Sequence, residues 1–190
     1  MNLKGTKTEK NLLASFAGES QARNRYDYFA KVAKKEGYEQ IAAIFAETAL
    51  NEMEHAKKFF KYLEGGMVEI TATYPAGQIK STLENLKAAA AGENEEWQIL
   101  YKNASDVAKD EGFLEIAETF RQIAKVESEH EKRYRKLIAN LENHKVFHKD
   151  NAVKWHCRNC GYVHEGTDAP DACPACKHPK SHFELFCENY

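Results

Sequence analysis

The chain has 190 residues and a net charge of −2, and its side chains are 29% charged and 43% hydrophobic, values typical of a soluble protein with one domain or one domain plus a small module. This charge balance gives no argument for nucleic-acid binding, which needs a concentrated basic face, and no apolar run approaches the ~20 residues that cross a bilayer. Because the first residues also lack the apolar core of a signal peptide, we expect a cytoplasmic protein.

The first 143 residues are predicted to be helical. All four prolines lie outside the long periodic segments. Capping boxes at Thr6–Glu9 and Ser81–Glu84 indicate helix starts, and Gly37 and Gly112 stand where helices are expected to end. The predicted helices cover about 7–36, 38–63, 81–111 and 113–143.

The connections predict how these helices are arranged. Short turns after the first and third helices force two antiparallel hairpins. The link at 64–80 breaks the helical pattern with glycines, a proline and β-branched residues. Its length of about 17 residues reaches ~56 Å when extended, whereas the second helix is only ~39 Å long. The link can therefore run back along the helices, and we expect a mainly α four-helix bundle with one long crossover.

The two predicted hairpins repeat each other. The segment "KVAKKEGYEQIAAIF" (31–45) matches "DVAKDEGFLEIAETF" (106–120), and "NEMEH" (51–55) matches "VESEH" (126–130), each 75 residues later. A duplication that preserves core packing explains matched apolar positions such as Val32 and Val107. It does not explain the matched Glu-x-x-His, which contains the only two histidines of residues 1–143.

The repeated acids and histidines form a recognisable ligand set. Residues three apart share a helix face, so each Glu-x-x-His projects both side chains together. With one glutamate from each of the other helices, this is the ligand set of a carboxylate-bridged di-iron or di-manganese site. The predicted ligands are Glu19, Glu52, His55, Glu93, Glu127 and His130. Carboxylates gathered in a bundle core would repel each other, and two divalent cations would cancel that charge. The alternatives are exposed Glu-x-x-His pairs or satisfied core histidines.

Three further side chains are predicted to lie near this site. Glu96 follows Glu93 by three residues and is either an exposed acid or an additional carboxylate that binds one metal in one redox state. Tyr26 and Tyr101 are candidate hydrogen-bond donors to the carboxylates, because Tyr26 follows Glu19 by seven residues. Alternatively, both tyrosines are ordinary bundle core.

The repeat contains an irregularity in the third helix. Val32 and Val107 are 75 residues apart, but Glu19 and Glu93 are 74 apart. One extra residue rotates an α-helix by ~100°, and a single-turn π-bulge can absorb it. We therefore predict a π-bulge between Glu93 and Val107. The alternative is a third helix that starts one residue out of register.

The last 37 residues are predicted to form a separate metal module. Cys157-x-x-Cys160 is followed after twelve residues by Cys173-x-x-Cys176, a strong signal for four thiolates around one metal ion. A module this small needs the metal to fold, but the spacing does not distinguish iron from zinc. The expected division is a bundle at 1–145, a linker at 146–153 and the module at 154–190, with Cys187 as an unremarkable thiol.

The motifs together resemble a known family. "CRNCGY" and "CPACKH" resemble rubredoxin, the one-iron electron carrier, and "ESQARNRY", "NEMEHAKKF" and "VESEHEKRY" extend the resemblance to rubrerythrin. This implies a ferritin-like di-iron bundle fused to a rubredoxin-like domain, with three irons per chain. It also implies a homodimer that reduces hydrogen peroxide to water in oxidative-stress defence, with electrons from NADH through a separate reductase or a rubredoxin.

The resemblance also implies how the ligands are shared. One iron takes Glu19, with Glu96 or His55 exchanging by redox state, and the other takes Glu93 and His130. Glu52 and Glu127 bridge the two irons. Two other functions stay open from the sequence. One is a ferroxidase that stores iron with the same ligands, and the other is a zinc-ribbon interaction protein with an inert bundle.

Overall fold

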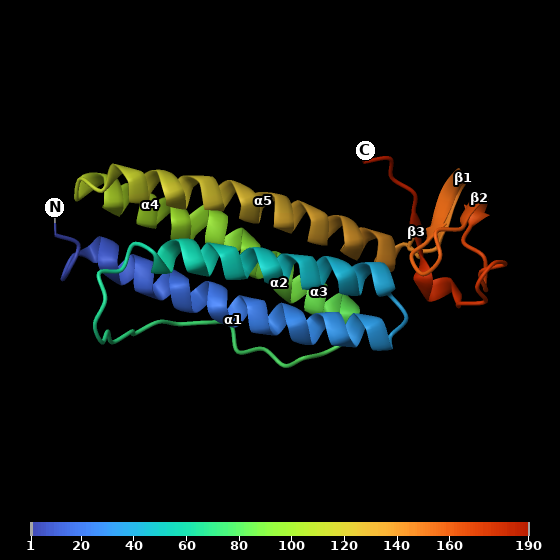
Figure 1. The fold of residues 1–190 in the computed structure, drawn as a ribbon, viewed down its shortest axis with the longest axis horizontal. Helices are drawn as coiled ribbons and strands as arrows, with labels where there is room; N and C mark the ends of the chain where they lie inside the picture. The colour runs from blue at the N-terminus through green and yellow to red at the C-terminus, as the bar shows by residue number, and fades with distance from the viewer. Residues whose placement is uncertain (1, 190) are drawn as a thin grey trace.

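The protein is a long helical bundle with a small β-domain at one end (Figure 1). The computed structural model describes residues 2–189. The helices are α1 (Lys7–Lys35), α2 (Glu39–Phe60), α3 (Thr82–Glu95), α4 (Tyr101–Asp110) and α5 (Leu114–Glu142). A five-residue π-helix, η1 (Glu96–Leu100), joins α3 and α4 into one continuous rod. The rod, α1, α2 and α5 make the predicted four-helix bundle.

The crossover runs along the outside of the bundle. In Figure 1 the extended segment between α2 and α3 passes along α1 from one end of the bundle to the other, so that α2 and α3 run in the same direction. Residues 64–80 are exposed throughout this path. The prediction of a four-helix bundle with one long crossover is confirmed.

The helix ends follow from local sequence signals. Thr6 Oγ1 accepts from the backbone N–H of Glu9 at 3.0 Å, and Ser81 Oγ accepts from that of Glu84 at 3.4 Å. Gly37 and Gly112 both have a φ of 85°, in the left-handed region that glycine adopts without steric cost. These residues fix where α1 and α3 start and where α1 and α4 end.

Each helical hairpin supplies a glutamate carboxylate that caps the start of the first helix in the other hairpin. The Glu111 carboxylate, after α4, accepts from the backbone N–H groups of Lys7 at 3.1 Å and Thr8 at 2.8 Å. The Glu36 carboxylate, after α1, accepts from the N–H of Thr82 at 3.0 Å. Because these glutamates and threonines are equivalent in the repeat, the bundle has an approximate twofold symmetry.

The predicted π-bulge is confirmed and lies where the repeat changes its offset. The N–H of Tyr101 donates to the carbonyl of Glu96, five residues earlier, as in a π-turn. Thr8 and Thr82 are still 74 residues apart, whereas Tyr26 and Tyr101 are 75 apart. The extra residue is therefore absorbed between Thr82 and Tyr101.

The bundle core has two apolar regions with a charged layer between them. One region, near the small domain, contains Phe45 and Tyr134. The other, at the far end, contains Phe59 and Phe120. The buried carboxylates come from the middle of the helices and separate these two regions.

The small domain is a three-stranded antiparallel sheet with strand order β2-β1-β3. Its elements are β1 (His148–Cys157), β2 (Val163–Asp168), the short 3-10 helix η2 (Lys180–His182) and β3 (Phe183–Leu185). The segment 146–153, expected to be a linker, is mostly strand. The reason is that β2 is long enough to pair Asp168 with His148, and the N–H of Ala169 donates to the carbonyl of Phe147 at 2.9 Å.

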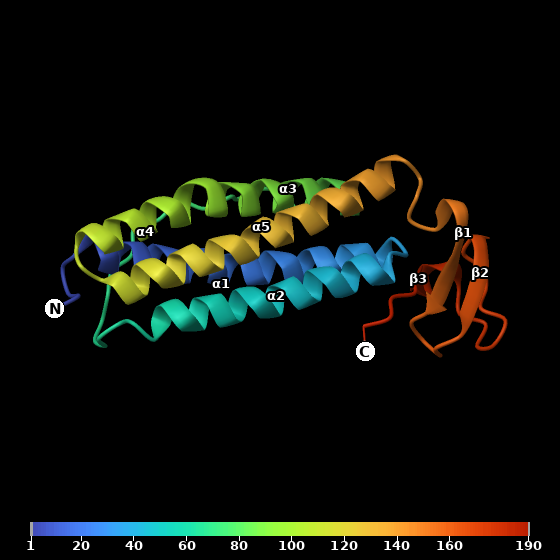
Figure 2. The ribbon, with the colours of Figure 1, turned by 90° about the horizontal axis from the view of Figure 1, so that it is seen from above.

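The small domain lies beyond the end of the bundle at which α1 turns into α2 (Figure 2), and side chains connect the two. The ring of Phe147 stacks on that of Tyr38, with centroids 6.1 Å apart, and His182 Nε2 lies 4.0 Å from Glu39 Oε1. Among residues 2–189, no helix is long and apolar enough to cross a membrane.

Removing one residue from the π-turn should leave the bundle folded. Deleting Gln98 reduces the interval from Glu93 to Tyr101 to seven residues, as in the equivalent part of α1. We expect a thermal midpoint within a few degrees of that of the parent protein. Deleting Asn103, beyond Tyr101, rotates buried residues of α4 out of the core and should lower the midpoint strongly. Equal destabilisation of both variants would contradict this account of the repeat.

Candidate metal centres

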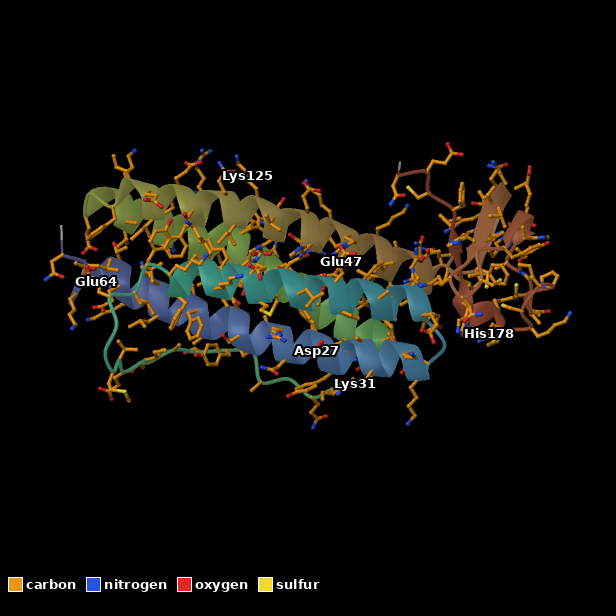
Figure 3. All side chains as sticks on the ribbon, in the orientation of Figure 1. Asp27, Lys31, Glu47, Glu64, Lys125 and His178 are labelled. Carbon is orange, nitrogen blue, oxygen red and sulfur yellow. The ribbon has the colours of Figure 1, made fainter. Side chains whose placement is uncertain are left out.

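Helices α1, α2, α3 and α5 each contribute side chains to one buried cluster. Glutamate oxygens and histidine nitrogens form two groups, in each of which one ligand atom per residue lies within 4.8 Å of the others. The first group is Glu19, Glu52, His55 and Glu127, and the second is Glu52, Glu93, Glu127 and His130. Glu52 and Glu127 belong to both groups, as bridging ligands must. Most other charged side chains, such as the labelled Glu47 and Lys125, lie on the outside of the bundle (Figure 3).

The two shared glutamates each face both histidines. His55 Nδ1 lies 2.9 Å from Glu127 Oε1 and 3.2 Å from Glu52 Oε2. His130 Nδ1 lies 2.8 Å from Glu127 Oε2 and 3.3 Å from Glu52 Oε1. Each carboxylate therefore directs one oxygen to each half of the cluster.

The electrostatics of the cluster call for added positive charge. Burial raises the pKa of Glu93 to about 8, and burial together with neighbouring carboxylates raises that of Glu19. Burial acts to lower the pKa of His130, but the adjacent carboxylates, chiefly Glu127 and Glu52, outweigh it and raise the pKa to about 12. Without metal, the protein would have to bind protons to bury these carboxylates.

The cluster also contains polar atoms that lack hydrogen bonds. Although several of these atoms lie close together, some have no hydrogen bond of suitable geometry within the described chain. They are Glu19 Oε2, Glu52 Oε1, Glu93 Oε2, both carboxylate oxygens of Glu127, and His130 Nδ1. Leaving a buried polar group unpaired costs about 1–3 kcal/mol. Unpaired atoms that converge on one small space are what two metal ions require, so the residues fit a dinuclear centre.

Two tyrosines each hold one further carboxylate oxygen. Tyr26 Oη donates to Glu93 Oε1 at 2.6 Å, and Tyr101 Oη donates to Glu19 Oε1. Each tyrosine thus crosses from one half of the repeat to the glutamate of the other half. These bonds orient the carboxylates and leave the second oxygen of each, Glu93 Oε2 and Glu19 Oε2, without a hydrogen-bond partner.

Glu96 lies beside the cluster but outside both groups. It is half-buried at the start of η1, and burial together with the charges of Glu93 and Glu127 raises its pKa well above the usual range. His55, by contrast, is within the first group. Of the two side chains expected to exchange, the structure therefore has His55 with the cluster and Glu96 outside it.

A cavity of about 510 Å³ lies beside Glu96 and the two tyrosines. Its walls include Glu96, Tyr26 and Tyr101, and residues 72–75 of the crossover line it as well. Arg25 and Tyr74 also line the cavity, and the sequence analysis missed both. Arg25 is inside the motif "ESQARNRY", but only the three-dimensional path of the crossover shows that these residues meet.

The four cysteines of the two Cys-x-x-Cys motifs form a second centre in the small domain. Cys157 Sγ lies 3.8 Å from Cys176 Sγ, and Cys160 Sγ lies 3.6 Å from Cys173 Sγ. Metal–sulfur bonds of about 2.3 Å in a tetrahedron place sulfurs ~3.8 Å apart, whereas a disulfide needs about 2.05 Å. The geometry fits one tetrahedral metal ion. Cys187 is exposed and lies outside this group.

The backbone around the cysteines favours thiolates. The N–H of His178 donates to Cys176 and is the main cause that lowers the pKa of this thiol to about 5. The N–H of Tyr162 acts in the same way on Cys160, but the neighbouring sulfurs outweigh it and raise the pKa to about 12. Four thiolates can therefore coexist here only around a cation.

Removing a tyrosine hydroxyl from the dinuclear site should weaken metal binding. Tyr26→Phe frees the Glu93 carboxylate and should lower the affinity of the bundle for Fe(II) about 10- to 100-fold, measured by anaerobic titration. Tyr134→Phe is the matched control, because Tyr134 is equally buried but its hydroxyl has no partner in the described chain. Equal losses of affinity in both variants would contradict an orienting role for Tyr26.

Comparison with known proteins agrees with both centres. The family model "Rubrerythrin" matches residues 10–138, and the model "Rubrerythrin, rubredoxin-like domain" matches residues 155–184. The rubrerythrin of Porphyromonas gingivalis is 62% identical over 100% of this chain and 94% of its own length. The rubrerythrin of Nitratidesulfovibrio vulgaris is 56% identical over 100% of this chain and 99% of its own.

Solved structures show the same architecture. Nigerythrin in a mixed-valence state has a TM-score of 0.65 and 31% identity, covering 97% of this chain and 88% of its own. The bacterioferritin of Desulfovibrio desulfuricans, with 24% identity, shares the fold of the bundle at a TM-score of 0.63, over 73% of this chain and 82% of its own. The chain therefore belongs to the rubrerythrin family, with a di-iron carboxylate site in its ferritin-like bundle and a four-cysteine iron site in its rubredoxin-like domain.

Proposed function

We propose that this protein is a peroxidase that reduces hydrogen peroxide to water at the di-iron site and regains electrons through its own four-cysteine iron. The observation that carries this proposal is the fusion of the two centres in one chain, because a one-electron carrier has no role in simple iron storage. Reduction of one peroxide to two water molecules consumes two protons and two electrons, and a reduced di-iron centre, when bound, would supply these two electrons.

We infer the ligands of the bundle irons from the two groups of converging atoms and from Glu96 beside them. When bound, one iron would be held by Glu19 with His55 or Glu96, and the other by Glu93 and His130. Glu52 and Glu127, which belong to both groups, would serve both irons. Cys157, Cys160, Cys173 and Cys176 would hold the third iron.

The protein's own side chains prepare the site for peroxide. Tyr26 and Tyr101 fix the carboxylates by hydrogen bonds from their phenol groups, so little rearrangement is needed when charge changes at the metals. The cavity lined by Glu96 gives a small oxidant a route to the cluster. The apolar regions above and below exclude water from the rest of the site.

The proposed partners follow from the exposed features. Cys160 is exposed and gives an NADH-linked reductase or a rubredoxin access to the four-cysteine iron. Exposed apolar side chains on the crossover and α2, including Met67, Ile79, Leu50 and Phe60, support a homodimer. None of the five cysteines is in a disulfide, which fits a reducing, cytoplasmic setting.

The choice of oxidant separates this proposal from a ferroxidase with the same ligands. When the fully reduced protein is mixed anaerobically with peroxide, or separately with O₂ at the same concentration, we expect the di-iron site to oxidise faster with peroxide. Stopped-flow absorbance measures both rates. Equal or faster oxidation by O₂, with iron loading far beyond three ions per chain, would favour iron storage.

The second centre should be required for turnover but not for binding iron in the bundle. Cys160→Ser breaks the thiolate set and should retain the two bundle irons while steady-state peroxide reduction with an external reductant falls to background. Cys187→Ser, at an exposed thiol outside the set, is the control and should keep full turnover. Circular dichroism and bundle iron content check that the first variant remains folded. Undiminished turnover in Cys160→Ser would show that electrons bypass the centre.

A further inference from the structure

A buried glutamate of α5 binds the helix on both sides of Glu96 without joining the metal cluster. Glu131 is only 6% exposed. Its Oε2 accepts from Trp97 Nε1 at 2.5 Å and from Asn94 Nδ2 at 3.1 Å. Asn94 is near the end of α3, and Trp97 is the second residue of η1. The carboxylate therefore joins the last α-helical turn to the start of the π-turn.

A positively charged side chain also faces this carboxylate. Arg135 Nε donates to the other oxygen at 2.6 Å. Hydrogen bonds to an ionised acceptor are roughly twice as strong as neutral ones, so the contact with the π-turn is strong for its size.

The first half of the repeat has neither the glutamate nor the π-turn. The residue equivalent to Glu131, 75 positions earlier, is Ala56, whose methyl group cannot accept a hydrogen bond. Helix α1, equivalent to the helix that Glu131 contacts, is continuous from Lys7 to Lys35. In this chain, the half of the repeat that has the carboxylate acceptor also has the π-turn, and the other half has neither.

The position of the π-turn decides where Glu96 points. Glu93 and Tyr101, on either side of it, are fixed by hydrogen bonds to Tyr26 and Glu19. These bonds require one extra residue to be absorbed between them, but they do not select the site of absorption. Moving the π-turn past Glu96 would rotate that residue by ~100° about the helix axis.

We propose that Glu131 is a positioning residue for Glu96: by binding Asn94 and Trp97 it fixes the π-turn at residues 96–100, and so sets where the Glu96 carboxylate stands beside the metals. This role rests on the proposed function to the extent that Glu96 is a ligand of one iron in one redox state. Glu131 itself is in neither of the two ligand groups.

The test compares the iron-loaded variants by Mössbauer spectroscopy of the oxidised protein. Trp97→Phe and Glu131→Ala should keep both bundle irons and change the signal of one ferric ion in the way that Glu96→Ala does. In the Glu96→Ala background, Trp97→Phe should add no further change, because both substitutions act through the same carboxylate. Glu129→Ala, at a side chain of α5 that is 70% exposed, is the matched control and should leave the spectrum unchanged.

Hydrogen exchange provides a second measurement, on the π-turn itself. In iron-loaded Trp97→Phe, the backbone amides of 97–101 should exchange about tenfold faster or more, as expected when a hydrogen bond to a charged acceptor is lost. Unchanged exchange would overturn the proposal. So would a spectral change that adds to that of Glu96→Ala, or a Glu96→Ala protein with an unaltered spectrum. Peroxide reduction by the parent protein, measured separately, decides the proposed activity, so the two failures are distinguishable.

Discussion

The bundle buries four carboxylates within a few ångströms of one another, and its core, caps and tyrosines are arranged around them. Glu19, Glu52, Glu93 and Glu127 are at most 1% exposed, and their mutual repulsion and lost hydration would oppose folding unless cations compensate. The apolar regions on both sides hold the helices at the required spacing. The tyrosines orient two of the carboxylates, and the caps fix the ends of the helices that carry them.

Duplication explains how one chain builds such a site, and its imperfection explains the chemistry proposed for it. Each half supplies a glutamate, a Glu-x-x-His pair and a tyrosine, so the two metal positions are nearly equivalent. The second half adds one residue to its helix, a π-turn and Glu96. That asymmetry places an additional carboxylate, Glu96, beside the cluster and in the wall of the cavity. A site that must change oxidation state benefits from a ligand that only one of its ions can use.

The sequence predicted the helices, the crossover and the π-turn because each has a local or periodic cause. Capping boxes and glycines mark the helix ends, and the change from 74 to 75 in the repeat indicates the extra residue. The converging ligands were equally predictable, since a repeated Glu-x-x-His is read directly from spacing. Long-range contacts were not. Nothing in the spacing of Arg25, Tyr74 or Glu131 shows which element will pack against them, and the start of β1 depended on how far β2 extends.

The proposed function requires peroxide to be reduced at the di-iron site and electrons to return from the four-cysteine iron afterwards. The most direct measurement mixes the fully reduced protein anaerobically with one equivalent of hydrogen peroxide and follows both centres in time. We expect the di-iron site to be oxidised first and the four-cysteine iron to be oxidised afterwards, as its electron passes to the bundle. Oxidation of the four-cysteine iron first, or an oxidised bundle beside a four-cysteine iron that stays reduced, would contradict the account.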